Sequence, residues 1–394
     1  MRDGWVDTVL GELAEITTGS RAKGGAITSG IPSIGGEQIA EDRSIKFNKM
    51  KFIPKDHFES MRTGKLKFGD SLLVKDGATT GKVGYWGYEI PAAVNEHVFI
   101  LRAKPDCAEP YFINLLISHK PFREEIESRT RGIIGGITRD IENIELVVPP
   151  LSEQKRIADL IASVDSYIEA LQQQLESAKR SRNAVLHELL TTGADDWVET
   201  TLGEVALLNP SEPALSDTAH FAPMDAVHVG KRWLQYTEER RDRNGARARA
   251  GDVLFARITP CLENGKIAQV QSEFERCGGS TEFIVVRGTE KCTSDFLYFW
   301  CTLKVNRDKA AELMTGTTGR QRLSWQDLGS LSLWLPPITE QNRIVSNISE
   351  FDSLIESTES AITESQNLRT GLLSDLLSGD HEIPASYDVV IGAA

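Results

Sequence analysis

Two stretches of the chain carry the same long helical pattern of apolar positions. Apolar residues recur in steps of four and three from residue 157 to residue 189, and again from residue 344 to residue 376. A stripe that keeps this spacing for more than four heptads is typical of helices that pair in a coiled coil. The stripe, called the seam below, includes Ile157, Ile161, Val164 and Ile168 in the first stretch and Ile344, Ile348, Phe351 and Ile355 in the second.

Both predicted helices begin at the same motif. The run Pro-Pro-Leu-Ser-Glu-Gln-Lys-Arg-Ile at 149–157 returns as Pro-Pro-Ile-Thr-Glu-Gln-Asn-Arg-Ile at 336–344. Ser152 and Thr339 are candidate N-caps, and an acidic residue follows each in the first turn, where the helix dipole favours it. The two copies start 187 residues apart. Solenoid repeats are only about 20–50 residues long, so this spacing indicates duplication of a whole domain.

An arginine interrupts both seams at equivalent positions, Arg182 and Arg369. One interpretation is that each arginine extends its head group to solvent near a helix end. The other is that it fixes the register of the helix pair or contacts a partner subunit. Gly193 and Gly379 follow the seams and are candidate C′ residues.

The segments before the two helices combine short β-branched runs with short helical stretches. Turn signals lead into predicted strands, and two apolar stretches between strands are typical of helices. The predicted strands are 68–74, 96–101, 250–255 and 282–286, and the predicted helices are 110–119 and 293–303.

The pattern therefore predicts an α+β fold made of two duplicated mixed α/β domains, each followed by a long helix. An antiparallel coiled coil of the two helices would relate the domains by an approximate two-fold axis. The predicted segments are domain 1 at 1–148, helix 1 at 149–193, domain 2 at 194–335, helix 2 at 336–379 and a flexible tail at 380–394.

The net charge of −13 is concentrated at the C-terminal end. Residues 336–394 hold ten acidic and two basic side chains, whereas each predicted globular domain is nearly neutral. Basic surfaces on the domains are therefore compatible with the global charge. The five cysteines form no CxxC pair, and no signal peptide or membrane-length apolar run is found, so we expect reduced thiols and a cytoplasmic location.

A search for catalytic motifs finds none. The chain has no GxxxxGK[ST] loop, no HExxH motif, and no Asn/Asp-Pro-Pro-aromatic tetrad of a DNA methyltransferase. We therefore expect no catalytic residue, no metal ligand and no cofactor in this chain.

Polar and basic loops follow equivalent predicted strands in both domains. Glycine lets the backbone approach a duplex, threonine and asparagine bond base edges or phosphates, and lysine and arginine bind phosphates or guanine. Each loop alone is also compatible with an ordinary solvated turn, as is the basic run at 240–249. The candidate DNA-contacting residues are Arg21, Lys23, Lys75, Thr79, Thr80, Lys82, Arg131, Arg139, Arg257, Thr259, Asn264, Lys266, Thr317, Thr318, Arg320 and Arg322.

Taken together, the doubled helix-start motif, the Gly-Asp-x-Leu strands and the order domain–helix–domain–helix resemble the specificity subunit of type I restriction-modification systems. The resemblance covers roughly residues 1–379. It implies that each domain is a target recognition domain for one half of a bipartite double-stranded DNA site. It also implies that the helices set the unread spacer and dock two DNA adenine methyltransferase subunits, which the restriction (motor-nuclease) subunits join. Methylation, ATP-driven translocation and cleavage would then reside in those partners.

Two other classes of protein stay open. A coiled-coil scaffold whose domains bind protein would show no DNA readout. Its DNA affinity would be absent or insensitive to salt, whereas phosphate contacts make affinity fall steeply with salt. A nuclease with its own cleft would need a cluster of metal-binding carboxylates and would cleave DNA alone.

Overall fold

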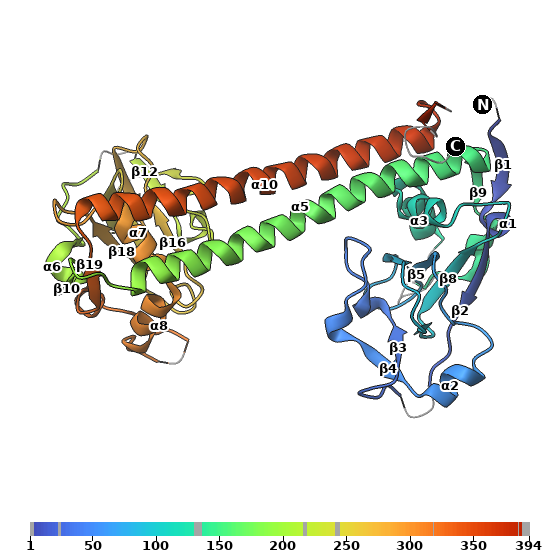
Figure 1. The fold of residues 1–394 in the computed structure, drawn as a ribbon, viewed down its shortest axis with the longest axis horizontal. Coiled ribbons are helices and arrows are strands. Elements are labelled where there is room, and N and C mark those ends of the chain that lie inside the picture. Colours follow the sequence, from blue (N-terminus) through green and yellow to red (C-terminus); the bar gives the residue numbers. More distant parts are fainter. Residues whose placement is uncertain are drawn as a thin grey trace. The chain divides into compact units, whose positions relative to one another are not determined.

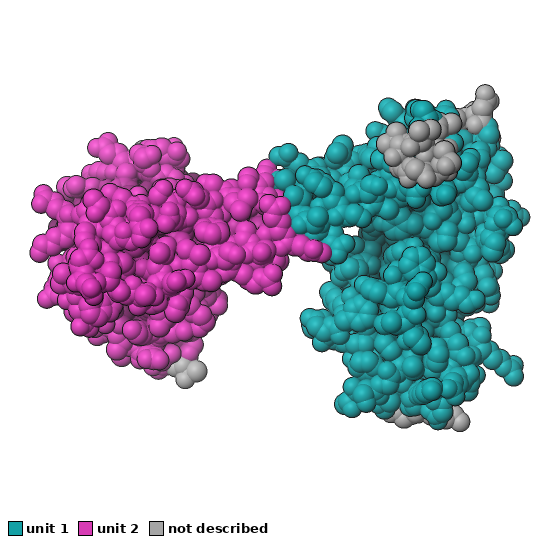
Figure 2. Space-filling view, viewed as in Figure 1, with its two compact units in different colours: residues 1–171, 361–394 teal, residues 172–360 magenta. Residues whose placement is uncertain are grey.

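The computed structural model describes residues 4–22, 25–129, 136–215, 219–240, 245–317, 319–384 and 386–387. Two compact units divide the chain, as the colours of Figure 2 show. Unit 1 contains residues 1–171 and 361–394, and unit 2 contains residues 172–360. Each unit therefore joins one globular domain to one part of each long helix.

The domain of unit 1 is built on an antiparallel four-stranded sheet (Figure 1). Its order is β2 (Ala14–Thr18), β8 (Val98–Ala103), β5 (Asp70–Val74) and β6 (Val83–Trp86). A smaller sheet has the order β4 (Lys51–Ile53), β3 (Ile31–Ile34) and β7 (Ala93–Val94). β1 (Val6–Val9) pairs with β9 (Glu145–Val148). The helices of this domain are α1 (Leu10–Leu13), α2 (Lys55–Ser60), α3 (Pro110–Ser118) and α4 (Lys120–Ser128).

Unit 2 repeats the strand arrangement of the main sheet and adds a fourth strand to the second sheet. Its main sheet has the order β11 (Leu207–Leu208), β18 (Phe283–Arg287), β15 (Val253–Ala256) and β16 (Ile267–Gln269). The second sheet has the order β13 (Glu238–Arg240), β12 (Ala219–Ala222), β17 (Arg276–Gly279) and β14 (Ala246–Arg249), and β10 (Val198–Thr201) pairs with β19 (Ser332–Leu335). Its helices are α6 (Leu202–Val205), α7 (Ser294–Thr302), α8 (Lys304–Glu312) and α9 (Trp325–Gly329).

The Gly-Asp-x-Leu motif has a structural role in both domains. Gly69 and Gly251 adopt φ of 90° and 84°, a left-handed conformation that glycine takes at little cost. The next residue, Asp70 or Asp252, is 1% exposed and pairs with an arginine on the adjacent central strand. The motif thus closes a turn and neutralises a buried carboxylate, which explains why both copies keep it.

The two long helices are α5 (Leu151–Thr191) and α10 (Ile338–Ser378). All twenty seam positions are buried or intermediate, which confirms the predicted stripe. In unit 1, Ile157 and Ile161 of α5 share a core with Leu373 of α10. In unit 2, the C-terminal part of α5 shares a core with Ile344 and Ile348. The start of one helix therefore packs with the end of the other in each unit, as an antiparallel pair does (Figure 1).

The predicted N-caps were wrong at both helix starts. Ser152 and Thr339 lie inside the first turn, because the carbonyls of Pro150 and Pro337 already accept the first helical N–H groups. Gly193 lies beyond the end of α5 without a positive φ, whereas Gly379 follows α10 directly with a φ of 78°.

The predicted flexible tail, 380–394, is partly packed. Within its described residues, Ile383 is 6% exposed and belongs to the apolar core of unit 1. A single apolar residue without a helical period was too weak a signal to predict this contact. Among the described helices, none has the length and apolar character needed to span a membrane.

Candidate nucleic-acid interface

The repeated helix-start motif fastens each domain to its long helix through a buried glutamine. The Gln341 side chain is 0% exposed and accepts the Thr293 N–H, at 2.9 Å. Its Nε2 donates to the carbonyls of Lys291 and Pro336, both at 2.9 Å. Thr293 is the N-cap of α7, so one amide side chain joins the starts of two helices.

Unit 1 contains the equivalent contact. Gln154 is 2% exposed, accepts the N–H of Glu109 at 3.1 Å and donates to the carbonyl of Pro149 at 3.0 Å. Glu109 is the N-cap of α3 and accepts the N–H of Phe112. The glutamine of the motif, rather than the predicted hydroxyl caps, is therefore the residue that holds the helix start in both copies.

The seam arginines form ion pairs between the two long helices. In unit 2, Arg182 of α5 donates from Nε and Nη2 to the Asp352 carboxylate of α10, with Nη2 at 3.3 Å. In unit 1, Arg369 of α10 donates in the same way to Asp165 of α5, with Nη2 at 3.0 Å. Both arginine side chains are 15% exposed, so the solvent-directed interpretation was wrong. Each pair is compatible with one helix register only, which favours a role in fixing it.

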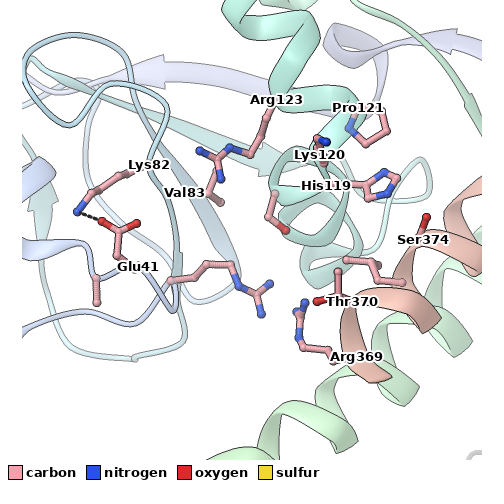
Figure 3. A pocket seen from close by; sticks show the side chains of 14 residues that line it. Glu41, Lys82, Val83, His119, Lys120, Pro121, Arg123, Arg369, Thr370 and Ser374 are labelled. Carbon is pink, nitrogen blue, oxygen red and sulfur yellow. Dashed lines mark ion pairs between the residues drawn. The ribbon is translucent and has the colours of Figure 1, made fainter. Parts of the chain in front are cut away.

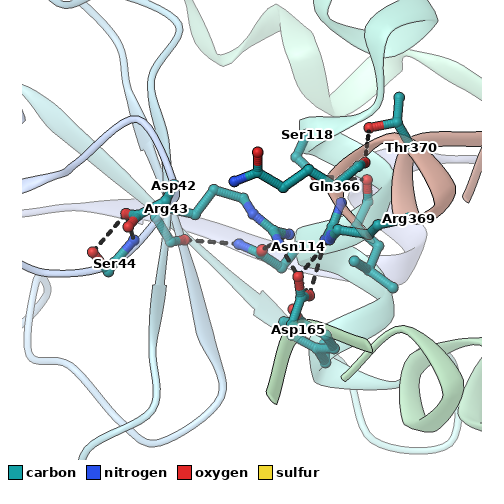
Figure 4. A network of polar contacts seen from close by, with 12 residues as sticks. Asp42, Arg43, Ser44, Asn114, Ser118, Asp165, Gln366, Arg369 and Thr370 are labelled. Carbon is teal, nitrogen blue, oxygen red and sulfur yellow. Dashed lines mark hydrogen bonds and ion pairs between the residues drawn. The ribbon is translucent and has the colours of Figure 1, made fainter. Parts of the chain in front are cut away.

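Among the described residues, Asp165 accepts bonds from more residues than its counterpart Asp352, and its contacts with Arg43 and Arg369 are drawn in Figure 4. Besides Arg369, it accepts the hydroxyl of Tyr111 and Nη2 of Arg43, the latter at 3.1 Å. Burial alone would raise the pKa of Asp165, but the bonds from Arg369 and Tyr111 and the charge of Arg43 hold that pKa below its ordinary value. The carboxylate is therefore stabilised in its charged form.

In unit 1, the predicted loop at 75–82 connects β5 to β6. Its threonine hydroxyl at Thr80 donates to the carbonyl of Gly77, and Thr79 is partly exposed. Lys82 pairs with Glu41 at 2.6 Å, and Lys75 lies 4.0 Å from Asp76. These cations are therefore partly neutralised within the domain.

The structure brings a second predicted loop of unit 1 beside the first. The N–H of Ile137 donates to the carbonyl of Lys75 at 2.6 Å, so the segment before Arg139 lies next to the exit of β5. Arg139 itself bonds the Ile16 carbonyl and Glu142, while Arg21 is 81% exposed, 4.0 Å from Glu96. The predicted residues Lys23 and Arg131 lie outside the described residues.

Unit 2 joins its two predicted loops in the same way. The N–H of Leu323 donates to the carbonyl of Arg257 at 2.8 Å, and the N–H of Thr259 donates to the carbonyl of Gln321 at 3.1 Å. The Nε of Arg257 is buried without a hydrogen-bond partner among the described residues. In each domain, a described residue at the end of the later polar loop is thus hydrogen-bonded to the strand-exit loop.

The other predicted DNA-contacting residues of unit 2 differ in whether their side chains already have a partner within the domain. Arg322 pairs with Glu282 at 2.8 Å, and Lys266 donates to the carbonyl of Met224. Thr259 donates to Glu263 at 3.1 Å. Asn264, Thr317 and Arg320 are exposed, and Thr318 lies outside the described residues.

A basic pocket of about 490 Å³ lies beside Lys82 in unit 1 (Figure 3). Its charged lining is Glu41, Arg43, Lys82, Lys120, Arg123 and Arg369. Arg123 is exposed, and its side chain makes no hydrogen bond or ion pair with the described part of the chain. Burial lowers the pKa of His119 at the same pocket, which favours its neutral form. Lys120 and Arg123 were not predicted from the sequence, although their three-residue spacing on a helix is a detectable signal.

The duplicated sheets and loop contacts define a protein with two equivalent domains, each joined to parts of two paired long helices. Among the described residues, no group of His, Cys, Asp and Glu side chains is placed to hold a metal ion. The family described as type I restriction modification DNA specificity domain matches the chain twice, over residues 2–180 and 195–365. The chain belongs to this family.

Individual relatives agree with this assignment. The chain is 23% identical to the putative type I restriction enzyme MjaX specificity subunit of Methanocaldococcus jannaschii, over 95% of this chain and 93% of that protein. It is 23% identical to the type I restriction enzyme StySPI specificity subunit of Salmonella potsdam, over 84% of this chain and 78% of that protein.

Two solved structures share the fold. A chain from a structural study of complex assembly and conformational transition in a type I restriction-modification system has a TM-score of 0.61 and 17% identity, covering 96% of this chain and 99% of that chain. The type I system S subunit of M. genitalium has a TM-score of 0.61 and 15% identity, covering 95% and 96%. At these identities the likeness is one of fold.

Proposed function

We propose that this chain is the DNA-reading subunit of a type I restriction-modification complex, and that each domain reads one half of a bipartite double-stranded site. The observation that carries the proposal is the repeated hydrogen bond between two polar segments of each domain, from Ile137 to Lys75 in unit 1 and from Leu323 to Arg257 in unit 2. A sheet with two polar loops at one end supplies the donors and acceptors that base edges and phosphates require.

Basic side chains around the loops support phosphate contacts. Lys82, Lys120 and Arg123 line the pocket of unit 1, and Arg320 is exposed in unit 2. DNA binding through such contacts loses affinity steeply as salt rises, because the duplex reclaims its counterions. A scaffold that binds only protein lacks this salt dependence.

The two long helices are proposed to set the spacer and to dock two DNA adenine methyltransferase subunits. Their register is fixed by the ion pairs of Arg182 and Arg369. Tyr167 and Leu354, at equivalent positions of the two helices, are 57% and 41% exposed and suit a protein partner. Methylation is assigned to those subunits, ATP-driven translocation and cleavage to restriction subunits, and the complex to the cytoplasm.

A map of methylated adenines tests the proposal. Cells with a companion methyltransferase are compared with and without this chain, and a second, unrelated specificity subunit shows that the methyltransferase is active. We expect a bipartite motif with a fixed gap that appears only with this chain. An active methyltransferase whose methylation pattern this chain leaves unchanged would favour the scaffold.

A further inference from the structure

One arginine in unit 1 connects the recognition domain to the long helices. Arg43 donates from Nη2 to Asp165 of α5 at 3.1 Å and from Nη1 to Asn114 of α3 at 3.2 Å (Figure 4). Its side chain is 17% exposed. Its carbonyl accepts the N–H of Tyr85, which belongs to β6 at the edge of the main sheet. Arg43 thus spans from the sheet edge to α5.

The backbone of Arg43 adds a second observation. Its φ is 73°, in the left-handed region that residues other than glycine and asparagine rarely adopt. Such a conformation persists where surrounding contacts compensate for its cost. Glycine adopts this backbone conformation at little cost and would suffice if the position served only to turn the chain. The presence of arginine therefore indicates that its side chain is required.

Unit 2 has an arginine in the equivalent place. The carbonyl of Arg232 accepts the N–H of Gln269, in β16 at the edge of the second main sheet. Its guanidinium donates to Asp295 of α7 at 2.6 Å and to Ser349 of α10 at 3.4 Å. Its side chain is 14% exposed. Both domains therefore place one largely buried arginine between the sheet edge, a short helix (α3 or α7) and a long helix.

The two connections differ in their acceptor on the long helix. In unit 1 the acceptor is Asp165, the same carboxylate that binds Arg369 between the helices. In unit 2 the interhelical carboxylate, Asp352, binds Arg182, while Arg232 uses Asp295 and Ser349. Among the described residues, a carboxylate that binds both the domain arginine and the interhelical arginine is therefore found in unit 1 alone.

We propose that Arg43 and Arg232 are positioning residues that hold each recognition domain at a fixed place on the helix pair, and that Asp165 couples this position to helix register in unit 1. The inference rests on the proposed function, because the consequence is discrimination between DNA spacers. A domain released from the helix would reach half-sites at neighbouring spacings without any change in the bases it reads.

The test compares methylation of duplexes that carry both half-sites with the native spacer or with one base pair more or less. The full chain is used with its companion methyltransferase. The quantity compared is the spacer ratio, the methylation rate on the native spacer divided by the rate on an altered spacer, which removes differences in overall activity. We expect R43Q to lower this ratio about tenfold, equivalent to about 1.4 kcal/mol, with base preference in each half-site unchanged. R43G should do the same, although it relieves the backbone conformation.

The chain supplies a matched control. D165N and D352N each weaken an interhelical ion pair, but only Asp165 binds Arg43. We expect D165N to lower the spacer ratio as R43Q does and D352N to lower it by less than about threefold. R43Q and R43G keep the Arg369–Asp165 pair, so they test the idea if D165N fails to fold.

Hydrogen exchange provides a readout that does not depend on DNA. The amide of Tyr85, bonded to the Arg43 carbonyl, should exchange faster in R43Q than in wild type. Unchanged spacer ratios in both R43Q and R43G would overturn the inference, as would equal losses in D165N and D352N. A wild-type chain that confers no bipartite specificity would instead contradict the proposed function.

Discussion

Replacing the buried glutamine of the helix-start motif by alanine should cost more stability in unit 2, as Q341A, than in unit 1, as Q154A. In Q341A, the Thr293 N–H and the carbonyls of Lys291 and Pro336 lose their partner. A buried polar group left without a hydrogen bond costs about 1–3 kcal/mol. The bond to Pro336 is fully buried and the other two are partly buried, so water replaces some of the loss. We expect a loss of about 3 kcal/mol in the free energy of unfolding.

The equivalent Q154A change in unit 1 should cost less, about 2 kcal/mol. Its three bonds measure 3.0, 3.1 and 3.4 Å, whereas those of Gln341 all measure 2.9 Å. Urea denaturation gives the two losses, and amide hydrogen exchange at Thr293 or Glu109 shows whether the opening is local to the mutated helix start.

The control is Q174A, at an exposed position of α5, which should change stability by about 0.5 kcal/mol or less. If Q341A unfolds with the same free energy as Q174A, the glutamine contributes nothing to holding the helix start. The doubled motif would then need another explanation, such as contact with a partner.

Three further predictions address DNA reading and charge. Inserting four residues after Leu175 lengthens α5 by about 6 Å and should change the methylated spacer or abolish methylation; an unchanged spacer contradicts the ruler. Changing Lys75, Thr80 and Lys82 together should relax one half-site in a methylation assay, and equal relaxation of both would refute two separate readers. Because the pKa of Asp165 is lowered, its stabilisation is present above the ordinary value of about 3.9 and is lost as pH falls through the lowered pKa. The stability gap between wild type and D165N should therefore shrink in acid, and a constant gap would contradict this.

The seam and the duplication could be predicted from the sequence because both are local periodic signals. The stripe from Ile157 onward fixes which face of α5 is buried, whatever it packs against. The partners of the polar residues on that stripe could not be predicted, because they depend on helix register. Arg369 and Asp165 are 204 residues apart, and Asp165 lies beside the seam rather than on it. Periodicity carries no information on which of several carboxylates an arginine reaches.

The same limit explains why the role of Arg43 could not be predicted from the sequence. It lies in a short polar turn, and its partner Asp165 is 122 residues away. The local sequence is that of an ordinary solvated turn. The left-handed backbone of Arg43 is seen only in the structure. Duplication supplies the missing signal once both folds are known, since Arg232 makes the same connection from the same sheet edge with different acceptors. If Arg43 served only to turn the chain, glycine would be more stable at that position. Nothing would then require an arginine at the equivalent place in the second domain. The repeated contact is therefore stronger evidence for a positioning role than either arginine alone.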